Sequence, residues 1–142
     1  STITFSSQLP GTLPAAANLE TIANAVYGLQ LTGENLDQHA FASGVALTYT
    51  LSITNLGNIS DTFIISVTSD WAFEAPLITG PLAAGEVAQI TVVIYVPIDA
   101  HSGDANLALI TFTSEGDPSK QEAVELTAQA VWFNLFIPVA LK

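Results

Sequence analysis

The side chains that could do acid–base or metal chemistry in this sequence are two histidines and 13 acidic residues. His39 follows Asp37 at a spacing of two residues, and His101 lies between Asp99 and Asp104. A histidine beside carboxylates can serve as a general base or as a metal ligand. The same residues also fit turns between strands, where small polar side chains are common. We favour the turn interpretation and place His39 in a loop over residues 33–44.

No recognised catalytic pattern accompanies these residues. The chain lacks the nucleophile-elbow motif, a phosphate-binding glycine loop and the His-Glu-x-x-His zinc motif. It has no cysteine, which excludes thiol catalysis, iron–sulfur clusters and thiolate zinc sites. A carboxylate pair for glycoside hydrolysis is compatible with the sequence, but all acidic residues are expected in loops or on outward strand positions. We therefore expect a protein that is not an enzyme.

Calcium is the metal that the sequence favours most. Asp99 and Asp104 in one predicted loop, and Glu115 and Asp117 in another, offer the hard oxygen ligands that calcium prefers. Neither pair has the spacing of a known calcium-binding loop, so solvated loop carboxylates are the alternative. No other cofactor is expected.

Two further features concern carbohydrate. Trp71, Phe73 and Tyr95 could form an aromatic platform for a sugar, or Trp71 could cap the core of the domain. Asn58-Ile59-Ser60 is the one Asn-x-Ser/Thr sequon in the chain. It lies in a predicted exposed turn, so Asn58 is a candidate glycosylation site.

The charge balance is strongly acidic, with a net charge of −11 and two basic residues, Lys120 and Lys142. This argues against binding to nucleic acid or to anionic membranes, which both need basic side chains. No stretch reaches the roughly 18 apolar residues of a membrane span. The chain begins at Ser1 rather than Met, as a mature protein does after signal-peptide removal. We therefore expect an extracellular or cell-surface location.

Alternating apolar residues predict the strands that would position these side chains. From Gly44 to Thr54 every second residue is apolar, which is the period of a strand with one buried face. The pattern recurs in later segments separated by Asn, Gly and Pro residues. About seven such strands predict an all-β fold, an immunoglobulin-like antiparallel β-sandwich with extra N- and C-terminal segments. The expected parts are an N-terminal arm or linker (1–24), the sandwich (25–130) and an apolar tail strand (131–142).

The N-terminal part leaves two alternatives open. Residues 14–26 could form a short helix with apolar residues on one face. They could equally be a linker that leads into a strand over residues 25–32.

The C-terminal tail is the feature that least fits a plain monomer. Residues 121–141 form a nearly unbroken extended run, which at about 3.3 Å per residue would be roughly 70 Å long, more than one sandwich needs. An exposed apolar tail would be an aggregation hazard. It could fold back on its own sandwich, or add as a strand to the open sheet edge of another copy, which produces open filaments. The candidate assembly residues are Ile3, Phe5, Val131, Trp132, Phe133, Leu135, Phe136, Ile137, Val139 and Leu141.

The strand and turn residues also carry a family resemblance. Gly44–Thr54, followed by Asn55-Leu56-Gly57-Asn58 and Asp61-Thr62-Phe63, resembles the bacterial and archaeal immunoglobulin-like domain often found beside α-galactosidase and carbohydrate-binding modules. Its second half is similar to Leu82–Glu86, Val96-Pro97, Ala100 and Gly103, so the resemblance covers about residues 25–130. It implies a spacer, adhesive repeat or assembly module without catalytic residues. Phe133–Lys142 is similar to a short tail of secreted proteins from certain filamentous bacteria, which implies secretion.

Together these features predict a structural subunit of an extracellular or cell-surface assembly, a filament or layer, that polymerises by terminal-strand addition between copies. The alternative is a non-catalytic binding or spacer module of a secreted protein, for carbohydrate or adhesion. The expected partners are copies of the chain itself, with cell-wall or extracellular glycans as a second class.

Overall fold

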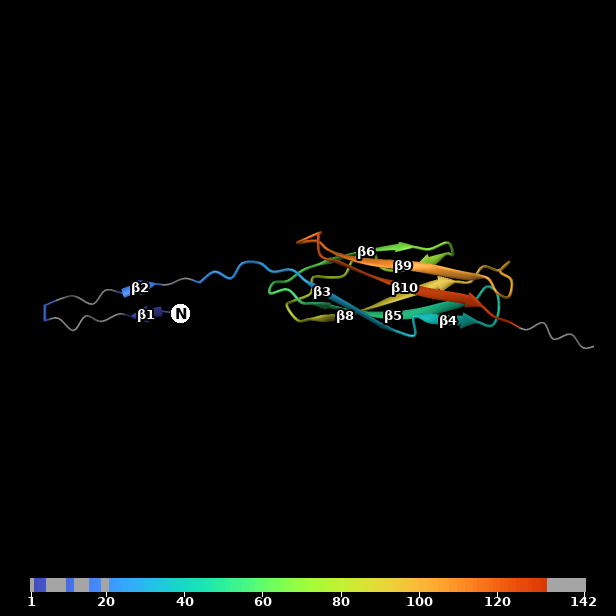
Figure 1. The fold of residues 1–142 in the computed structure, drawn as a ribbon, viewed down its shortest axis with the longest axis horizontal. Helices are drawn as coiled ribbons and strands as arrows, with labels where there is room; N and C mark the ends of the chain where they lie inside the picture. The colour runs from blue at the N-terminus through green and yellow to red at the C-terminus, as the bar shows by residue number, and fades with distance from the viewer. Residues whose placement is uncertain (1, 5–9, 12–15, 19–20, 133–142) are drawn as a thin grey trace, which may run out of the picture.

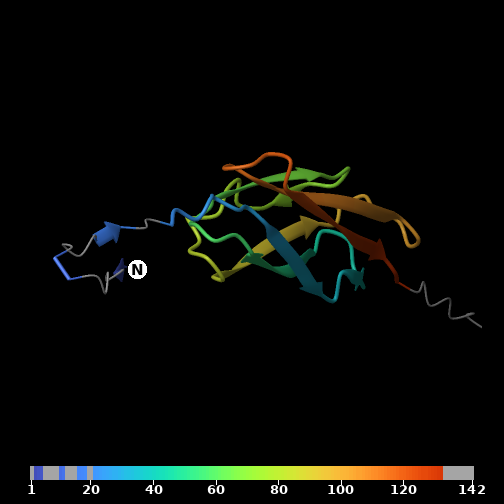
Figure 2. The same ribbon diagram turned by 60° about the vertical axis from the view of Figure 1, so that its left-hand side comes forward.

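The computed structural model describes residues 2–4, 10–11, 16–18 and 21–132 of the 142-residue chain. Two four-stranded sheets form a sandwich, and a separate antiparallel hairpin joins β1 (Thr2–Thr4) to β2 (Ala16–Asn18). Figures 1 and 2 show this hairpin apart from the sandwich. The described residues contain no helix, and hence none long and apolar enough to cross a membrane.

The two sheets have the strand order of an immunoglobulin-type sandwich. The first sheet is antiparallel, in the order β3 (Leu29–Glu34), β5 (Ala46–Asn55), β8 (Val87–Tyr95) and β7 (Phe73–Glu74). The second sheet has the order β4 (Asp37–Ala40), β10 (Gln121–Ala130), β9 (Ala105–Ser114) and β6 (Phe63–Thr68). The predicted all-β sandwich is therefore confirmed.

The first strand of the sandwich is divided between the two sheets. Asn35 makes the crossing with a positive φ of 52°, a conformation that asparagine adopts more readily than most residues. The chain then enters β4, which pairs in parallel with β10. His39 therefore lies in a strand, opposite Gln129, and its predicted position in a loop was wrong. The prediction failed because the Asp37–His39 segment is polar and short, without a periodic apolar pattern.

The core lies between the sheets and is built by the alternation seen in the sequence. Tyr49, Leu51 and Ile53 of β5 are fully buried, as the pattern over residues 44–54 predicted. β6, β8, β9 and β10 contribute their inward-facing apolar residues to the same cluster. Its other buried members are Leu29, Phe63, Ile65, Leu82, Ile90, Val92, Ile94, Ala108, Ile110, Phe112, Leu126 and Ala128.

The chain enters and leaves the sandwich at opposite ends, which we call the entry pole and the exit pole (Figure 1). At the entry pole, residues 21–28 run without regular secondary structure beside the loop that follows β5. The N–H of Leu56 donates to Gly28 and that of Asn58 to Val26. Of the two sequence alternatives, the structure thus excludes a helix over the described part of residues 14–26, and the strand begins only at Leu29.

Candidate functional site

The two histidines lie in exposed positions. His39 and Asp37 are exposed residues of β4. His101 Nδ1 lies 3.8 Å from Asp104 Oδ2, and the backbone N–H of His101 donates to the same oxygen at 2.7 Å. The Asp104 carboxylate therefore stabilises its own turn, which agrees with the turn interpretation.

The calcium candidates lie at opposite ends of the molecule. Asp99 and Asp104 belong to the loop between β8 and β9 at the exit pole, and Glu115 and Asp117 to the turn between β9 and β10 at the entry pole. Asp117 Oδ1 accepts hydrogen bonds from the hydroxyl and N–H of Ser119, which lower the pKa of Asp117. Within the described ranges, no three His, Asp or Glu side chains gather into a group that could hold a metal ion.

The three aromatic residues do not form one platform. Trp71 is half-buried and packs against the core. Tyr95 lies on the outer face of the first sheet, where hydrogen bonding to Glu74 raises the pKa of Tyr95. Phe73 pairs with the inward-facing Ile94 and so faces the opposite side from Tyr95. Of the two interpretations, the structure agrees with Trp71 as a cap of the core.

Asp61 lies outside the named strands, in an isolated bridge with Leu82, but unlike most loop carboxylates it is buried. It is only 5% exposed. Its carboxylate accepts hydrogen bonds from the Ser114 hydroxyl and from the N–H groups of Thr62 (2.8 Å) and Gly116 (3.2 Å). Three donors offset the cost of burying the carboxylate. Asp61 therefore ties the start of β6 to the turn after β9 and has a structural role.

The first two residues of the predicted tail belong to the exit pole. The Val131 N–H donates to Ala40 at 2.7 Å, which extends the pairing of β10 with β4. The Trp132 N–H donates to Ser102 Oγ at 3.1 Å, and the indole packs on a small cluster that contains Ala40 and Ala130. Ile3 lies in β1, opposite Ala17. The remaining assembly candidates lie outside the described residues: Phe5, Phe133, Leu135, Phe136, Ile137, Val139 and Leu141.

One edge of the second sheet is only partly covered. β4 pairs with residues 127–130 of β10, so the preceding residues 121–126 have β9 as their only strand partner in the described chain. We call residues 121–126 the β10 edge. The Thr127 N–H donates toward β4, to Leu36, at 2.7 Å. Backbone groups alternate in direction along a strand. The N–H and C=O groups of Ala123 and Glu125 therefore point to the same side as the N–H of Thr127, where β4 does not reach them.

The β10 edge lies beside β3 of the other sheet. The Glu122 carboxylate reaches across and accepts the Leu31 N–H at 2.8 Å. Val124 and Leu31 next to this contact are only half-buried. An inward-pointing charge at a sheet edge discourages unspecific pairing. The Glu122 side chain therefore bridges the two sheets here, beside apolar residues that remain partly accessible.

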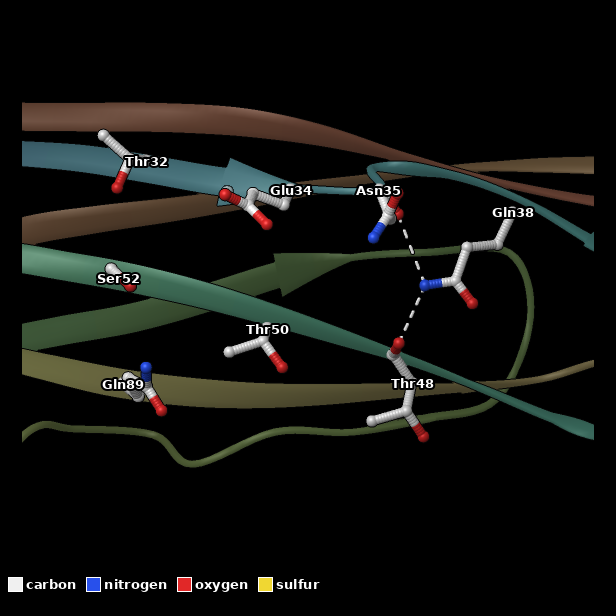
Figure 3. Close-up of a pocket in the computed structure, with 9 residues that line it drawn as sticks. Thr32, Glu34, Asn35, Gln38, Thr48, Thr50, Ser52 and Gln89 are labelled. Carbon is white, nitrogen blue, oxygen red and sulfur yellow. Dashed lines mark hydrogen bonds between the residues drawn. The ribbon is translucent and has the colours of Figure 1, made fainter.

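A polar groove of about 570 Å³ lies on the outer face of the first sheet (Figure 3). β3, β5 and β8 form its floor, and the crossing from β3 to β4 forms one wall. Gln38 is fixed there, because its Nε2 donates to the backbone oxygens of Thr48 (2.8 Å) and Asn35 (3.3 Å). The lining residues are Thr32, Gly33, Glu34, Asn35, Gln38, Thr48, Thr50, Ser52 and Gln89.

This polar groove was not predicted from the sequence. Its one available signal is that the outward positions of the alternating segment over residues 44–54 hold Thr and Ser, where charged side chains are more usual. The wall could not be foreseen because it depends on the crossing at Asn35.

Comparison with known proteins identifies the fold. No protein-family model matches the sequence, and no curated protein matches it. A FixG-related protein from Vibrio parahaemolyticus is similar in structure, with a TM-score of 0.51, 15% identity, and coverage of 78% of this chain and 98% of that one. The PapD-like domain 7 of human CEP192 gives a TM-score of 0.52 at 11% identity, over 92% of this chain and all of that one.

The SrpA adhesin of Streptococcus sanguinis also has a similar structure. Its TM-score is 0.52 at 10% identity, over 74% of this chain and 58% of that one. At such low identities, these similarities establish an immunoglobulin-like sandwich fold for the chain and no more than the fold.

Proposed function

We propose that this chain is a non-catalytic structural module of an extracellular or cell-surface assembly, in which the apolar tail of one copy adds as a strand to the β10 edge of the next. The observation that carries the proposal is the relative position of the tail, which is the donor strand, and the β10 edge, which would accept it. The β10 edge lies in the entry half of the sandwich, whereas the tail leaves from the exit pole. Such a contact is head-to-tail. It leaves a free tail at one end of the polymer and a free β10 edge at the other, so further copies can add without closing a ring.

The length and composition of the tail suit a donor strand. Residues 133–142 contain aromatic and aliphatic side chains, one lysine and no acidic residue. Ten extended residues span about 33 Å, more than enough for the six residues of the β10 edge. An added strand would give Ala123 and Glu125 backbone partners, and its inward side chains would cover Val124 and Leu31. Backbone hydrogen bonds and apolar burial are the usual basis of strand addition.

A second copy is a better donor than the same copy. β4 occupies the position beside residues 127–130 of β10, so a tail that turned back would meet β4 before the free part of the edge. Charge favours the pairing weakly: Lys142 is basic, and the β10 edge carries Glu122 and Glu125. An exposed ion pair contributes at most about 1 kcal/mol.

The surface location is part of the proposal. It is supported by the low charged fraction of 11% and by the family resemblance, which implies a spacer or assembly module. By its name, the structurally similar SrpA is an adhesin, which is compatible with such a location.

The test uses the full chain and two variants: one lacks the donor strand, and the other has a blocked β10 edge. Deletion of residues 133–142 removes the donor. Ala123→Pro removes the N–H that faces the uncovered side and breaks no bond to β9, while the control Ala123→Ser keeps that N–H. Electron microscopy and light scattering should find polymers for the full chain and the serine variant. They should find monomers for the two blocked variants, of about 15 kDa for the proline variant and slightly less for the truncated chain.

Mixing the two blocked variants gives the sharper result. The truncated chain still offers its β10 edge and the proline variant still offers its tail, so together they should form one-to-one heterodimers and stop there. Polymers of the truncated chain, or a mixture that stays monomeric, would contradict strand addition through this edge. A monomeric full chain would favour the alternative, a binding or spacer module.

A further inference from the structure

We infer that the polar groove on the first sheet is a binding site for a neutral, hydroxyl-rich glycan chain. The groove is independent of the β10 edge, because it lies on the outer face of the other sheet. Its volume of about 570 Å³ lies within the range of about 300 to 1,000 Å³ found for small-molecule sites, although its lining is polar where most such sites are apolar.

The groove exists because short side chains lie between long ones. β5 runs through its middle and presents Thr48, Thr50 and Ser52 outward. Glu34 at the end of β3 and Gln89 on β8 rise on either side (Figure 3). A sheet face with this pattern is hollow along its central strand, so a flat or extended ligand can reach the hydroxyl groups.

The lining side chains keep most of their hydrogen-bonding capacity for a ligand. Figure 3 marks two hydrogen bonds between lining residues, and both come from Gln38 Nε2. The hydroxyls of Thr32, Thr48, Thr50 and Ser52 can each donate and accept, as can the amides of Asn35 and Gln89, and Glu34 can accept. Sugar hydroxyls, which also donate and accept, are complementary to such a mixture.

The composition of the groove argues against other ligands. An anion would need basic side chains, and Lys120 and Lys142 are the two that the sequence contains, neither of them in the lining. An apolar ligand would need apolar walls, and no apolar side chain lines the groove. The lining also lacks an aromatic ring for stacking, so each site should bind weakly. Repeated copies on a surface would raise the effective affinity by avidity.

The experiment is isothermal titration calorimetry of the full chain with cellohexaose, chitohexaose and maltohexaose, and with hexagalacturonate as an anionic comparison. At least one neutral oligosaccharide should bind, and hexagalacturonate should bind at least tenfold more weakly. The double variant Thr50→Val, Gln89→Ala should lose about tenfold or more in affinity, because it removes two neutral hydrogen-bonding groups. Thr91→Val is the matched control: Thr91 is the β8 residue opposite Thr50 on the same outer face, but it does not line the groove. The affinity of Thr91→Val for the oligosaccharide should be within twofold of that of the unchanged chain.

Three results would overturn the inference: no neutral oligosaccharide binds, the double variant binds as well as the control, or hexagalacturonate binds best. Thermal unfolding shows whether the double variant is folded. If it is not, the single Gln89→Ala change on the exposed surface replaces it, and unchanged affinity in that variant would also contradict the site. Polymer formation, measured on the same samples, should not change, so failure of the groove and failure of strand addition are separate outcomes.

Discussion

Tyr49 places a hydroxyl group in the middle of a hydrophobic core. Its side chain is fully buried, and the hydroxyl donates to the backbone oxygen of Thr127 on β10 at 2.7 Å. A buried hydroxyl without a partner would cost roughly 1–3 kcal/mol. The bond therefore lets a large aromatic ring fill the core and links the two sheets at one point.

Tyr49 should make the protein less stable at alkaline pH. Burial, assisted by the charge of Asp37, raises the pKa of Tyr49 from 10.0 to about 12. Because the folded state holds the proton more tightly than the unfolded state, this contribution is complete below pH 10 and is lost as the pH rises toward 12. Urea unfolding of the unchanged chain at pH 8, 10, 11 and 12 should show this loss. Tyr49→Phe should be less stable at pH 8 but show a flatter decline above pH 10. If the free energy of unfolding fell equally in the two proteins above pH 10, the loss would not come from Tyr49.

Asp61 shows which residue-scale features escape sequence analysis. A carboxylate in a turn is normally exposed, and nothing next to Asp61 in the sequence indicates otherwise. Its burial depends on Ser114, which is 53 residues away. The turn of His101 and Asp104 could be interpreted correctly because its contacts are local. His39 was wrongly placed in a loop, because its strand forms only by pairing with a distant segment. The burial of Asp61 could not be predicted either, because its partners are brought together only by the fold.

At the scale of elements, the sequence predicts a strand well when that strand has one buried and one exposed face. β5 satisfies this condition and was predicted from residues 44–54, and β6, β8, β9 and β10 correspond to later segments with the same alternation. β4 was missed because it is polar and pairs in parallel with residues 90 positions later in the chain. The polar groove was missed for the same reason, since one wall is the crossing into β4. The β10 edge could not be predicted either, because it depends on where β4 begins, at Asp37 opposite Thr127.

The segment before β3 should depend on Asn58 for its order. Asn58 Oδ1 accepts the Val26 N–H, and its Nδ2 donates to the backbone oxygen of Asn24, both at 2.8 Å. The sequon residue thus anchors residues 24–26 to the entry pole. We expect Asn58→Ala to raise the hydrogen-exchange rate of the Val26 amide about tenfold, since a lost hydrogen bond is worth about 1 kcal/mol.

Asn24→Ala is the matched control for this prediction. Asn24 takes part through its backbone oxygen, which alanine retains, so its exchange pattern should stay close to that of the unchanged chain. Equal exchange in the two variants would mean that the backbone bonds of the segment are sufficient and that Asn58 is free to carry a glycan without a structural role.

At the scale of the whole molecule, both poles expose apolar side chains. Val26 and Leu56 are exposed at the entry pole, and at the exit pole Phe41 is 75% and Ile98 82% exposed. Single exposed apolar residues are ordinary, but here they lie at the ends from which the arm and the tail depart. A head-to-tail contact would bury both sets together. The poles and the β10 edge therefore support the same direction of assembly, along the long axis of the sandwich.

The net charge of −11 opposes that assembly and should make it depend on salt. Each added copy brings like charges together, and their repulsion reaches about 30 Å at 0.01 M salt but only about 8 Å at 0.15 M. Polymers measured by sedimentation velocity should therefore lengthen when NaCl rises from 10 to 150 mM. The chain without residues 133–142 should sediment as a monomer at both concentrations. If polymers shorten with salt, attraction between Lys142 and the glutamates of the β10 edge outweighs repulsion, and Lys142→Gln should then abolish the effect. That result would contradict repulsion between copies as the limit on assembly, but apolar burial would remain the main source of affinity, because one exposed ion pair contributes at most about 1 kcal/mol.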